Sequence, residues 1–271
     1  MVIGKKEFDT NNHTYIMGIL NVTPDSFSDG GRYLSADAAL RHAQEMIDDG
    51  ADILDVGGES TRPGHTQITE EEEIERTAPV IEKLKQEFDI PISIDTYKSS
   101  VARAALQAGA SLVNDIWGLK FDSSMAGLIA DYGAACCLMH NRTESIYQDF
   151  LADFMTDMRE CIRIAREASI PEDRIILDPG VGFGKTYEMN LTVIREIGQM
   201  RELGYPILLG TSRKSVIGLT LDLPADQREE GTLVTTVYGM MNGCSFVRVH
   251  DVKANRRAIQ MLEAIMEEKH G

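Results

Sequence analysis

The sequence lacks the features that mark membrane-spanning, secreted and disulfide-stabilised proteins. It has no apolar run of about 18 residues, the length needed to cross a bilayer, and its opening stretch, MVIGKKEF, holds no hydrophobic signal-peptide core. The four cysteines form no C-x-x-C pair; they are Cys136, Cys137, Cys161 and Cys244. We expect these cysteines to be reduced and largely buried, and we expect the protein to be cytoplasmic.

Basic residues are also scarce, and their scarcity argues against two classes of partner. The chain has 27 Lys and Arg residues against 43 Asp and Glu residues, which gives a formal net charge of −16 at pH 7. A surface this acidic repels nucleic acid and anionic membranes, so we expect neither as a partner. An anionic small-molecule substrate would need a local cluster of basic side chains.

The apolar residues fall into short runs that end in polar residues and alternate with helical patterns. With 271 residues, 43% of them hydrophobic, the chain can form one large core or two small ones. Helix starts are predicted at Ser35, at Thr69 with Glu72 as a capping box, and at Asp251. The strands are predicted at residues 14–20, 52–56, 92–94, 112–113, 134–139, 174–177, 207–209 and 246–249.

Eight strand–helix units in roughly 250 residues fit the size of a (β/α)8 barrel, although a doubly wound open sheet shows the same alternation. An open sheet gathers its polar residues at one switch point, whereas a barrel brings every strand end to one mouth. A polar residue lies at or near the end of every predicted strand: Asn21, Asp55, Asp95, Asn114, His140, Asp178, Ser212 and Arg248. We therefore predict a TIM barrel forming a single domain over residues 1–271, with a short N-terminal hairpin within residues 2–12 that closes the barrel bottom.

The carboxylates at the predicted mouth need donors. Asp178 has no cation among its neighbours in the sequence DPGVG. An unpaired buried carboxylate is costly, so its expected partner is a ligand that presents N–H groups; alternatively, Asp178 caps the loop that follows it. Asp95 has the similar alternative of capping a helix at Tyr97. Of the adjacent Asn114 and Asp115, one can be purely structural.

A glycine-rich stretch, GVGFGKT at residues 180–186, looks at first like a phosphate-binding loop. It lacks the Walker A spacing, because Pro179 stands where the first glycine is required, and a nucleoside triphosphatase is thus disfavoured. We expect the glycines to bring the backbone close to a flat ligand. Phe183 either contacts that ligand or packs in the core.

An anion site is predicted after the last two strands, where barrels commonly hold phosphate. Arg248, His250 and the N-terminus of the helix after Asp251 supply positive potential there. Lys214, in GTSRKS at residues 210–215, adds a cation, unless it and its neighbour Arg213 are a solvated pair. Arg62 contributes a further charge from the loop after the second strand.

Seven motifs, in this order between Tyr15 and the C-terminus, resemble those of the dihydropteroate synthase family. They are NVTPDSFSDGG (21–31), DVGGESTRPG (55–64), IDT (94–96), ND (114–115), DPGVGFGK (178–185), SRKS (212–215) and RVH (248–250). The resemblance implies a transferase of folate biosynthesis, a sulfonamide target, that acts as a homodimer with Mg²⁺. It implies the condensation of 6-hydroxymethyl-7,8-dihydropterin pyrophosphate with p-aminobenzoate to give 7,8-dihydropteroate and pyrophosphate.

The resemblance also assigns roles to individual residues. It implies a pterin site of Asp95, Asn114, Met139, Asp178, Phe183, Lys214 and Arg248. It implies a pyrophosphate site of Asn21, Arg62, Arg248 and His250, in which Asn21 is also the Mg²⁺ ligand. The p-aminobenzoate and sulfonamide site would comprise Phe27, Thr61, Arg62, Pro63, Lys214 and Ser215, and the catalytic residues would be Asp95, Lys214, Arg248 and His250.

Two alternatives share the predicted barrel. The first is a pterin-binding methyltransferase that uses a folate methyl donor; the motifs TPDSFSDGG and STRPG argue against it. The second is a catalytically silent pterin-binding paralogue. Against it stand the intact polar positions Asn21, Thr61, Arg62, Lys214, Arg248 and His250.

Overall fold

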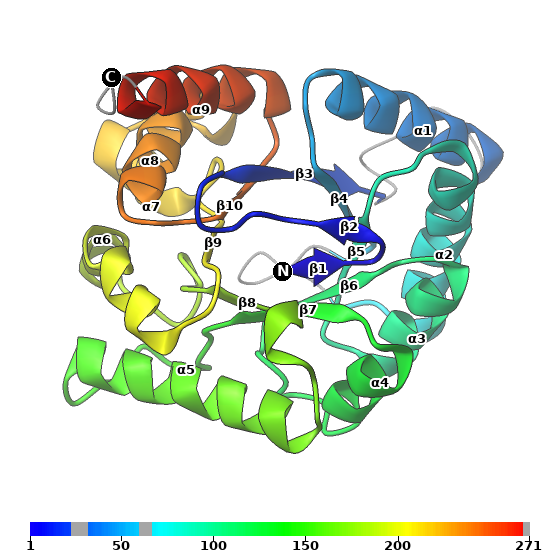
Figure 1. Cartoon of the computed structure of the whole chain (residues 1–271), viewed down its shortest axis with the longest axis horizontal. Helices are drawn as coiled ribbons and strands as arrows, with labels where there is room; N and C mark the ends of the chain where they lie inside the picture. The colour runs from blue at the N-terminus through cyan, green and yellow to red at the C-terminus, as the bar shows by residue number, and fades with distance from the viewer. Residues whose placement is uncertain (23–31, 60–66, 268–271) are drawn as a thin grey trace.

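Strands and helices alternate along the chain in the computed structural model, which describes residues 1–22, 32–59 and 67–267, with the backbone alone over 32–36 (Figure 1). The strands are β1 (Val2–Ile3), β2 (Lys6–Glu7), β3 (Tyr15–Asn21), β4 (Ile53–Gly57), β5 (Ile92–Asp95), β6 (Leu112–Asp115), β7 (Ala135–Met139), β8 (Ile175–Asp178), β9 (Leu208–Leu209) and β10 (Phe246–Val249). The α-helices are α1 (Arg32–Asp48), α2 (Glu70–Glu87), α3 (Ser99–Ala108), α4 (Met125–Tyr132), α5 (Phe150–Glu167), α6 (Tyr187–Arg195), α7 (Ser215–Leu221), α8 (Glu229–Met241) and α9 (Val252–Glu267). Short 3-10 turns η2 (Glu172–Arg174), η3 (Ile197–Leu203) and η4 (Ala225–Gln227) complete the set.

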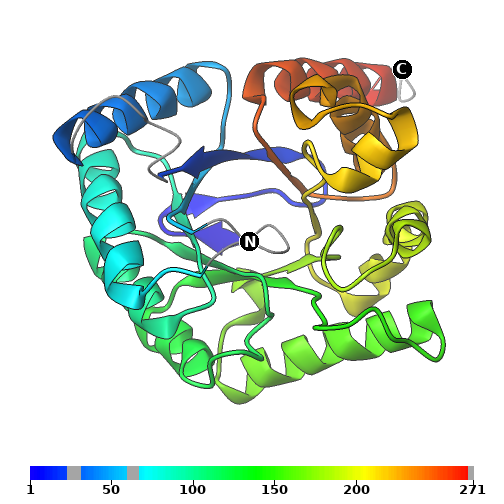
Figure 2. The ribbon, with the colours of Figure 1, turned by 180° about the vertical axis from the view of Figure 1, so that it is seen from behind.

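The strands from β3 to β10 form a barrel with a ring of helices outside it, as seen from the two ends in Figures 1 and 2. The eight-stranded sheet has the order β8-β7-β6-β5-β4-β3-β10-β9, and its paired strands are parallel. A parallel bridge between Leu177 and Ile207 joins the two ends of the sheet. The predicted (β/α)8 barrel is thereby confirmed.

The helix starts are set by local capping. Thr69 accepts a hydrogen bond from the Glu72 amide at 3.2 Å, and Asp251 accepts one from the Ala254 amide at 3.0 Å, as the sequence predicts. The predicted start at Ser35 is wrong, because α1 already begins at Arg32. No Gly or Pro separates Arg32 from Ser35, and serine is tolerated inside a helix.

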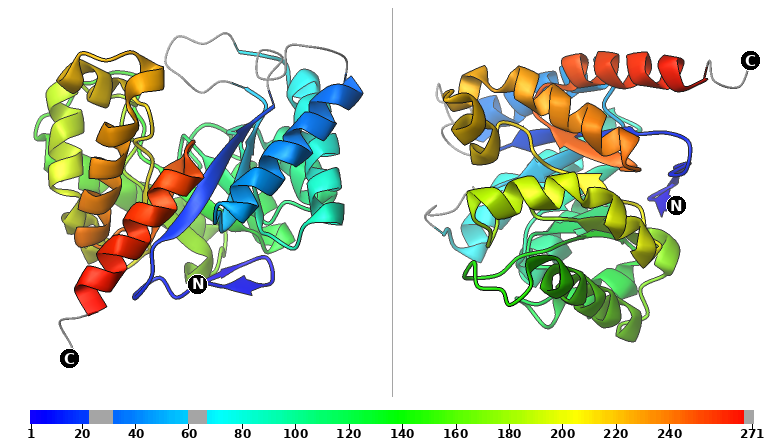
Figure 3. Two further views of the ribbon diagram at one scale, coloured as in Figure 1. Left: turned by 90° about the horizontal axis from the view of Figure 1, so that it is seen from above. Right: turned by 90° about the vertical axis from the view of Figure 1, so that its left-hand side faces the viewer.

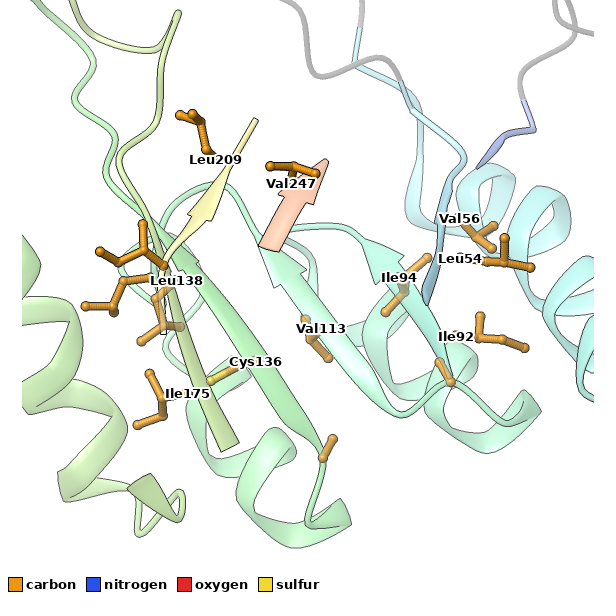
Figure 4. Close-up of a cluster of buried hydrophobic side chains, with 14 of the residues drawn as sticks. Leu54, Val56, Ile92, Ile94, Val113, Cys136, Leu138, Ile175, Leu209 and Val247 are labelled. Carbon is orange, nitrogen blue, oxygen red and sulfur yellow. The ribbon is translucent and has the colours of Figure 1, made fainter. Parts of the chain in front are cut away.

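Successive side chains along each strand point to opposite sides, so the barrel wall has an inner and an outer face. One set of alternate side chains points outward and packs under the helices, as Leu54 and Val56 do on β4 and Ile175 does on β8 (Figure 4). These side chains form the large core between strands and helices. The other set points into the barrel, and this inner set carries the candidate site.

The N-terminal end of the barrel interior is apolar and covered. Strands β1 and β2 form an antiparallel hairpin at the end where β3 begins (Figure 3). Ile3 and Phe8 pack against the first inward side chains of the barrel, including Met17, Ile53 and Phe246, and both are almost fully buried. The hairpin predicted within residues 2–12 is therefore confirmed as a plug of the barrel bottom.

Two further sequence expectations can be compared with the described residues. All four cysteines are buried and free, as predicted. No helix within the described ranges is both long and apolar enough to cross a membrane.

Candidate active site

The inner face of the barrel changes from apolar to polar along each strand. On β4, Ile53 belongs to the apolar bottom layer, and Asp55, two residues later, is a buried carboxylate. On β6, Leu112 is followed in the same way by Asn114, and on β8 Ile176 is followed by Asp178. A two-residue period therefore collects polar groups at the C-terminal ends of the strands, which is where barrel enzymes have their active sites.

One guanidinium joins two carboxylates at the centre of this polar layer. Arg248 donates from Nε to Asp55 at 2.6 Å and from Nη2 to Asp95 at 2.7 Å. Asn114 donates to the same Asp55 oxygen at 3.1 Å. Burial opposes the charge of Arg248, but the two carboxylates outweigh this effect and raise its pKa.

The cluster keeps hydrogen-bonding capacity that the described residues do not use. Asp55 Oδ1, Ser93 Oγ and Asp95 Oδ1 are buried without a hydrogen-bond partner among them. Burial raises the pKa of Asp95 to about 7, against the opposing effect of Arg248. Orphaned buried acceptors are rare in folded proteins and costly. They indicate a ligand that brings hydrogen-bond donors into the barrel mouth.

Asp178 provides another acceptor at this mouth. Its Oδ1 accepts from the Gly180 amide at 2.7 Å, so the side chain does cap the following loop, and its second oxygen lies beside Gly210. No cation lies close to Asp178 in the sequence, but Lys214 lies close enough in the fold to interact with its charge. The charge of Lys214 partly offsets burial, which raises the pKa of Asp178.

Lys214 is fixed between two elements of the site. Its Nζ donates to the Val181 carbonyl at 2.6 Å and lies 4.9 Å from the centre of the Phe183 ring. Burial lowers the pKa of Lys214 to about 8, although Asp178 acts in the opposite direction. Phe183 also packs against the small cluster of Tyr97, Ile116 and Met139, which is the packing alternative considered for it; contact with a ligand stays a prediction.

Two glycines of the loop at residues 180–184 let the backbone approach another segment of the chain closely. A Cβ on Gly180 would lie 1.9 Å from the His140 carbonyl oxygen, and one on Gly184 would lie 2.5 Å from that of Arg142. Both glycines have positive φ, at +66° and +55°. The close approach thus seats this loop on the segment that follows β7, and the predicted approach to a flat ligand stays a prediction.

The residues of the predicted anion site are held by neighbouring loops. Ser212 contacts His250 Nδ1 at 2.9 Å and accepts a hydrogen bond from the His250 amide at 3.2 Å. Ser215 is the first residue of α7 and is exposed. Arg213 is exposed as well and has a left-handed φ of 58°.

Asn21 lies at the C-terminal end of β3, in register with Gly57, which is itself in register with Asp95. The Asn21 side-chain oxygen is 3.4 Å from the position of a Cβ on Gly57, so this carboxamide lies over Gly57 at the strand end. No group of three or more His, Cys, Asp or Glu side chains within the described residues could hold a metal ion by itself.

The structure brings together most of the predicted site residues and adds others. Strand register places Asn114 beside Asp95, and Met139 beside Asp178. Asp55 is predicted at the mouth but without a contact of its own. Ser93 is not predicted, although its position two residues before Asp95 on the same strand is a usable signal. Asp115 is the structural member of its pair, since it accepts from the Trp117 and Leu119 amides at 2.8 and 2.7 Å. Four predicted residues lie outside the described ranges: Phe27, Thr61, Arg62 and Pro63.

Comparisons with known proteins agree on the family. Residues 17–250 match the family model described as pterin binding enzyme. A dihydropteroate synthase of Clostridium beijerinckii is 58% identical over 98% of this chain and 99% of its own length. One of Bacillus subtilis is 55% identical over 93% of this chain and 89% of its own length.

Solved structures give the same result. A dihydropteroate synthase of Clostridium difficile, crystallised in the presence of pteroic acid, superposes with a TM-score of 0.93 at 53% identity, covering 96% of this chain and 99% of its own. That of Yersinia pestis, in a sulfonamide drug complex, has a TM-score of 0.92 at 38% identity, covering 98% and 99%. On these grounds, which confirm the resemblance seen in the motifs, the chain belongs to the dihydropteroate synthase family of pterin-binding transferases.

Proposed function

We propose that the chain condenses 6-hydroxymethyl-7,8-dihydropterin pyrophosphate with p-aminobenzoate to give 7,8-dihydropteroate and pyrophosphate. The observation that carries this proposal is the set of buried acceptors without partners, Asp55 Oδ1, Ser93 Oγ and Asp95 Oδ1, beside the cations Arg248 and Lys214. A pterin ring presents several N–H donors on one edge and carbonyl and nitrogen acceptors on the other. The mouth of the barrel offers the complementary groups.

The pterin would lie across the inner face of the strands. Asp178 would accept from its 2-amino and N3–H groups, because one carboxylate oxygen faces the mouth while the other holds the Gly180 amide. Asn114 and Asp95, neighbours in register, would serve the remaining ring nitrogens. Lys214 would donate to the 4-oxo and N5 acceptors. The ring faces would pack on Met139, on Phe183 and on the plane of Arg248.

The pyrophosphate would lie at the loops after β9 and β10. His250, oriented by Ser212, and Arg248 are the described residues that suit an anion there. Arg62 belongs to the same proposal but lies outside the described residues. A net charge of −16 on the chain makes this local placement of cations necessary.

We further propose that Mg²⁺ accompanies the pyrophosphate, with Asn21 as its protein ligand. One carboxamide oxygen at an open strand end suits a cation that prefers oxygen ligands and retains waters and substrate phosphates in its shell. When bound, Mg²⁺ would neutralise charge on the pyrophosphate leaving group.

The p-aminobenzoate pocket is proposed next to the start of α7, where Lys214 and the exposed Ser215 can contact the second substrate. The family's remaining predicted contacts, Phe27, Thr61, Arg62 and Pro63, lie outside the described residues. We propose that sulfonamides, which imitate p-aminobenzoate, compete for this pocket.

The chemistry is proposed to depend on electrostatics rather than on a general base. The bond between the pterin methylene carbon and pyrophosphate oxygen breaks, the arylamine nitrogen bonds to that carbon, and the displaced amine proton passes to solvent or pyrophosphate. An arylamine is neutral at pH 7 and needs no prior deprotonation. Asp95 would stabilise positive charge that develops on the pterin, and Arg248 and His250 would stabilise the departing pyrophosphate.

Pyrophosphate release tests the proposal and separates it from the alternatives. With both substrates and Mg²⁺, the enzyme should release one pyrophosphate per dihydropteroate formed. A silent paralogue would bind the pterin without releasing pyrophosphate. A methyltransferase would release none and would instead demethylate a methylated folate, so either outcome would overturn the proposal.

We also propose that the protein is a cytoplasmic homodimer. Large apolar side chains are exposed along the consecutive helices α6, α7 and α8, including Leu219 at 67%, Val234 at 68% and Met241 at 67% of their surface. A patch of this kind on neighbouring helices is typical of an interface. The four buried cysteines without disulfides support a reducing compartment.

The dimer proposal can be tested by sedimentation. Val234→Lys should shift the protein from dimer to monomer because it would bury a charge in the interface. Ile146→Lys, at a residue 69% exposed on the loop after β7, is the matched control and should remain dimeric. A wild-type monomer, or a dimer that tolerates Val234→Lys, would contradict the proposed interface.

A further inference from the structure

A second network of charged side chains lies behind the glycine-rich loop and has no role in the proposed reaction. Lys185 Nζ contacts His140 Nδ1 at 2.8 Å, the Gly180 carbonyl at 2.9 Å and the Phe183 carbonyl at 3.0 Å. His140 is fully buried, and its Nε2 lies 3.0 Å from Asp157. These residues come from two consecutive strand–helix units, β7–α5 and β8–α6.

The contacts fix the proton positions in this network. Arg142 donates to Asp157 at 2.6 Å, and its hydrogen bond and that of His140 lower the pKa of Asp157 in spite of burial. An ionised Asp157 requires a proton on His140 Nε2. Burial lowers the pKa of His140 to about 4, so the ring is neutral and Nδ1 can only accept.

Lys185 therefore faces three acceptors, which are the His140 nitrogen and two carbonyl oxygens. An ammonium has three N–H donors and satisfies all of them, whereas a neutral amine would leave one acceptor without a donor. Burial lowers the pKa of Lys185 well below its usual value, with Asp178 acting against this effect. The acceptors thus compensate the charge that burial disfavours.

The two carbonyls that Lys185 holds belong to the loop at residues 180–184. The same loop carries the Val181 carbonyl that receives Lys214 Nζ at 2.6 Å and the Phe183 ring beneath that ammonium. Its far end is tied by Tyr147, which donates to the Gly184 carbonyl at 2.7 Å. Any displacement of this loop would move Lys214 and Phe183 together.

We propose that Lys185, oriented by His140 and Asp157, is a positioning residue that holds the 180–184 loop so that Lys214 and Phe183 are preorganised for the pterin. This inference rests on the proposed pterin site and deepens it. Lys185 acts through the loop and does not contact the substrate. An apolar side chain at this position would leave the Gly180 and Phe183 carbonyls without their hydrogen bonds from Lys185. The loop that positions Lys214 would then be held less firmly.

Calorimetric titration with 6-hydroxymethylpterin tests this role. Lys185→Met should raise the Kd at least roughly tenfold, since small misplacements of site groups have effects of this size. The alkaline limb of kcat/KM, which we attribute to Lys214, should also move, because the Val181 carbonyl that accepts from Lys214 Nζ belongs to the loop that Lys185 holds. Loss of stability alone would not move that limb.

Two further variants keep the test decisive. Lys5→Met, at an exposed lysine between β1 and β2 at the opposite end of the barrel, is the control and should change neither Kd nor the alkaline limb. Asp157→Asn leaves Lys185 in place but frees His140 to turn Nδ1–H toward it. It should weaken binding and move the alkaline limb as well, and combined with Lys185→Met it should add little to either effect.

The possible results separate this inference from the proposed function. Wild-type enzyme that fails to bind 6-hydroxymethylpterin would overturn the pterin site itself. Wild-type binding with a Lys185→Met Kd within twofold of it, or an unmoved alkaline limb, would overturn the positioning role alone. If Lys185→Met does not fold, the same two readouts on Asp157→Asn decide the question.

Discussion

Replacing Asp178 by Asn should remove most of the affinity for pterin while preserving the fold. The amide oxygen can still accept from the Gly180 amide, which the carboxylate holds at 2.7 Å. The amide nitrogen then takes the place of the second oxygen, beside Gly210. In the proposed complex this position faces the 2-amino and N3–H donors, so a donor would meet donors.

The expected rise in the Kd for pterin follows from the hydrogen bonds that the Asp178→Asn variant loses. A hydrogen bond to a charged group contributes about 1.5–3 kcal/mol, and 1.4 kcal/mol corresponds to a factor of ten in Kd. One such loss raises the Kd roughly 10- to 150-fold, and the repulsion between donors adds to it. Because burial already raises the pKa of Asp178, removing its charge also relieves a cost in the free protein.

The assay is calorimetric titration with 6-hydroxymethylpterin, whose lack of phosphates excludes compensation by the anion site. Asp115→Asn is the matched control. Asp115 is an equally buried carboxylate, but it serves the Trp117 and Leu119 amides, so its replacement should lower stability and spare binding. A Kd for Asp178→Asn within twofold of wild type, in a folded protein, would refute the assignment of Asp178 to the pterin.

Three further outcomes are expected. First, kcat/KM should fall as pH rises through about 8, where Lys214 loses the proton that it donates to the pterin. The Lys214→Arg variant should not show this alkaline fall. If the variant still shows it, the fall belongs to another group. Second, Lys98→Met should lower the free energy of unfolding by about 3–5 kcal/mol, because Lys98 joins Glu59 and Glu73 at 2.7 and 2.8 Å. Burial raises the pKa of Glu73 above its unfolded value, and more so without Lys98, so the variant's stability should be highest in acid and fall as pH rises, as pH-dependent urea unfolding would show or disprove. Third, EDTA should weaken binding of the pterin pyrophosphate and leave 6-hydroxymethylpterin unaffected; equal effects in calorimetry would contradict the role of Asn21 in holding Mg²⁺.

The barrel could be predicted from the sequence because its signals are local. Each strand is a short apolar run, and the polar residue at its end is read directly from the chain. The strand predicted at 246–249 has the observed bounds, and that at 92–94 is extended only by the carboxylate Asp95. Capping by Thr69 and Asp251 depends on residues three positions apart, which a sequence displays.

The partners inside the site could not be predicted, because barrel closure brings together residues that are remote in the sequence. Arg248 and Asp55 are separated by 193 positions, and Arg248 and Asp95 by 153. The family resemblance implies that Arg248 belongs to the pterin and pyrophosphate sites, and nothing in the sequence connects it to two carboxylates. Lys185 was similarly read as part of a false phosphate loop, since its partner His140 lies 45 positions away.

These pairings explain how an acidic barrel can bind an anionic substrate. Among the described residues, three carboxylates, Asp55, Asp95 and Asp178, share the mouth with the cations Arg248 and Lys214, and these residues leave some of the acceptors unsatisfied. A neutral pterin supplies N–H donors to those acceptors without adding charge. Once the pterin donates to Asp95, the Nη2 group of Arg248 would be released from that carboxylate and would contribute to the proposed anion site with His250. Recognition of the ring and of the pyrophosphate would therefore be coupled through one arginine, because each part of the substrate makes the other part's contacts available.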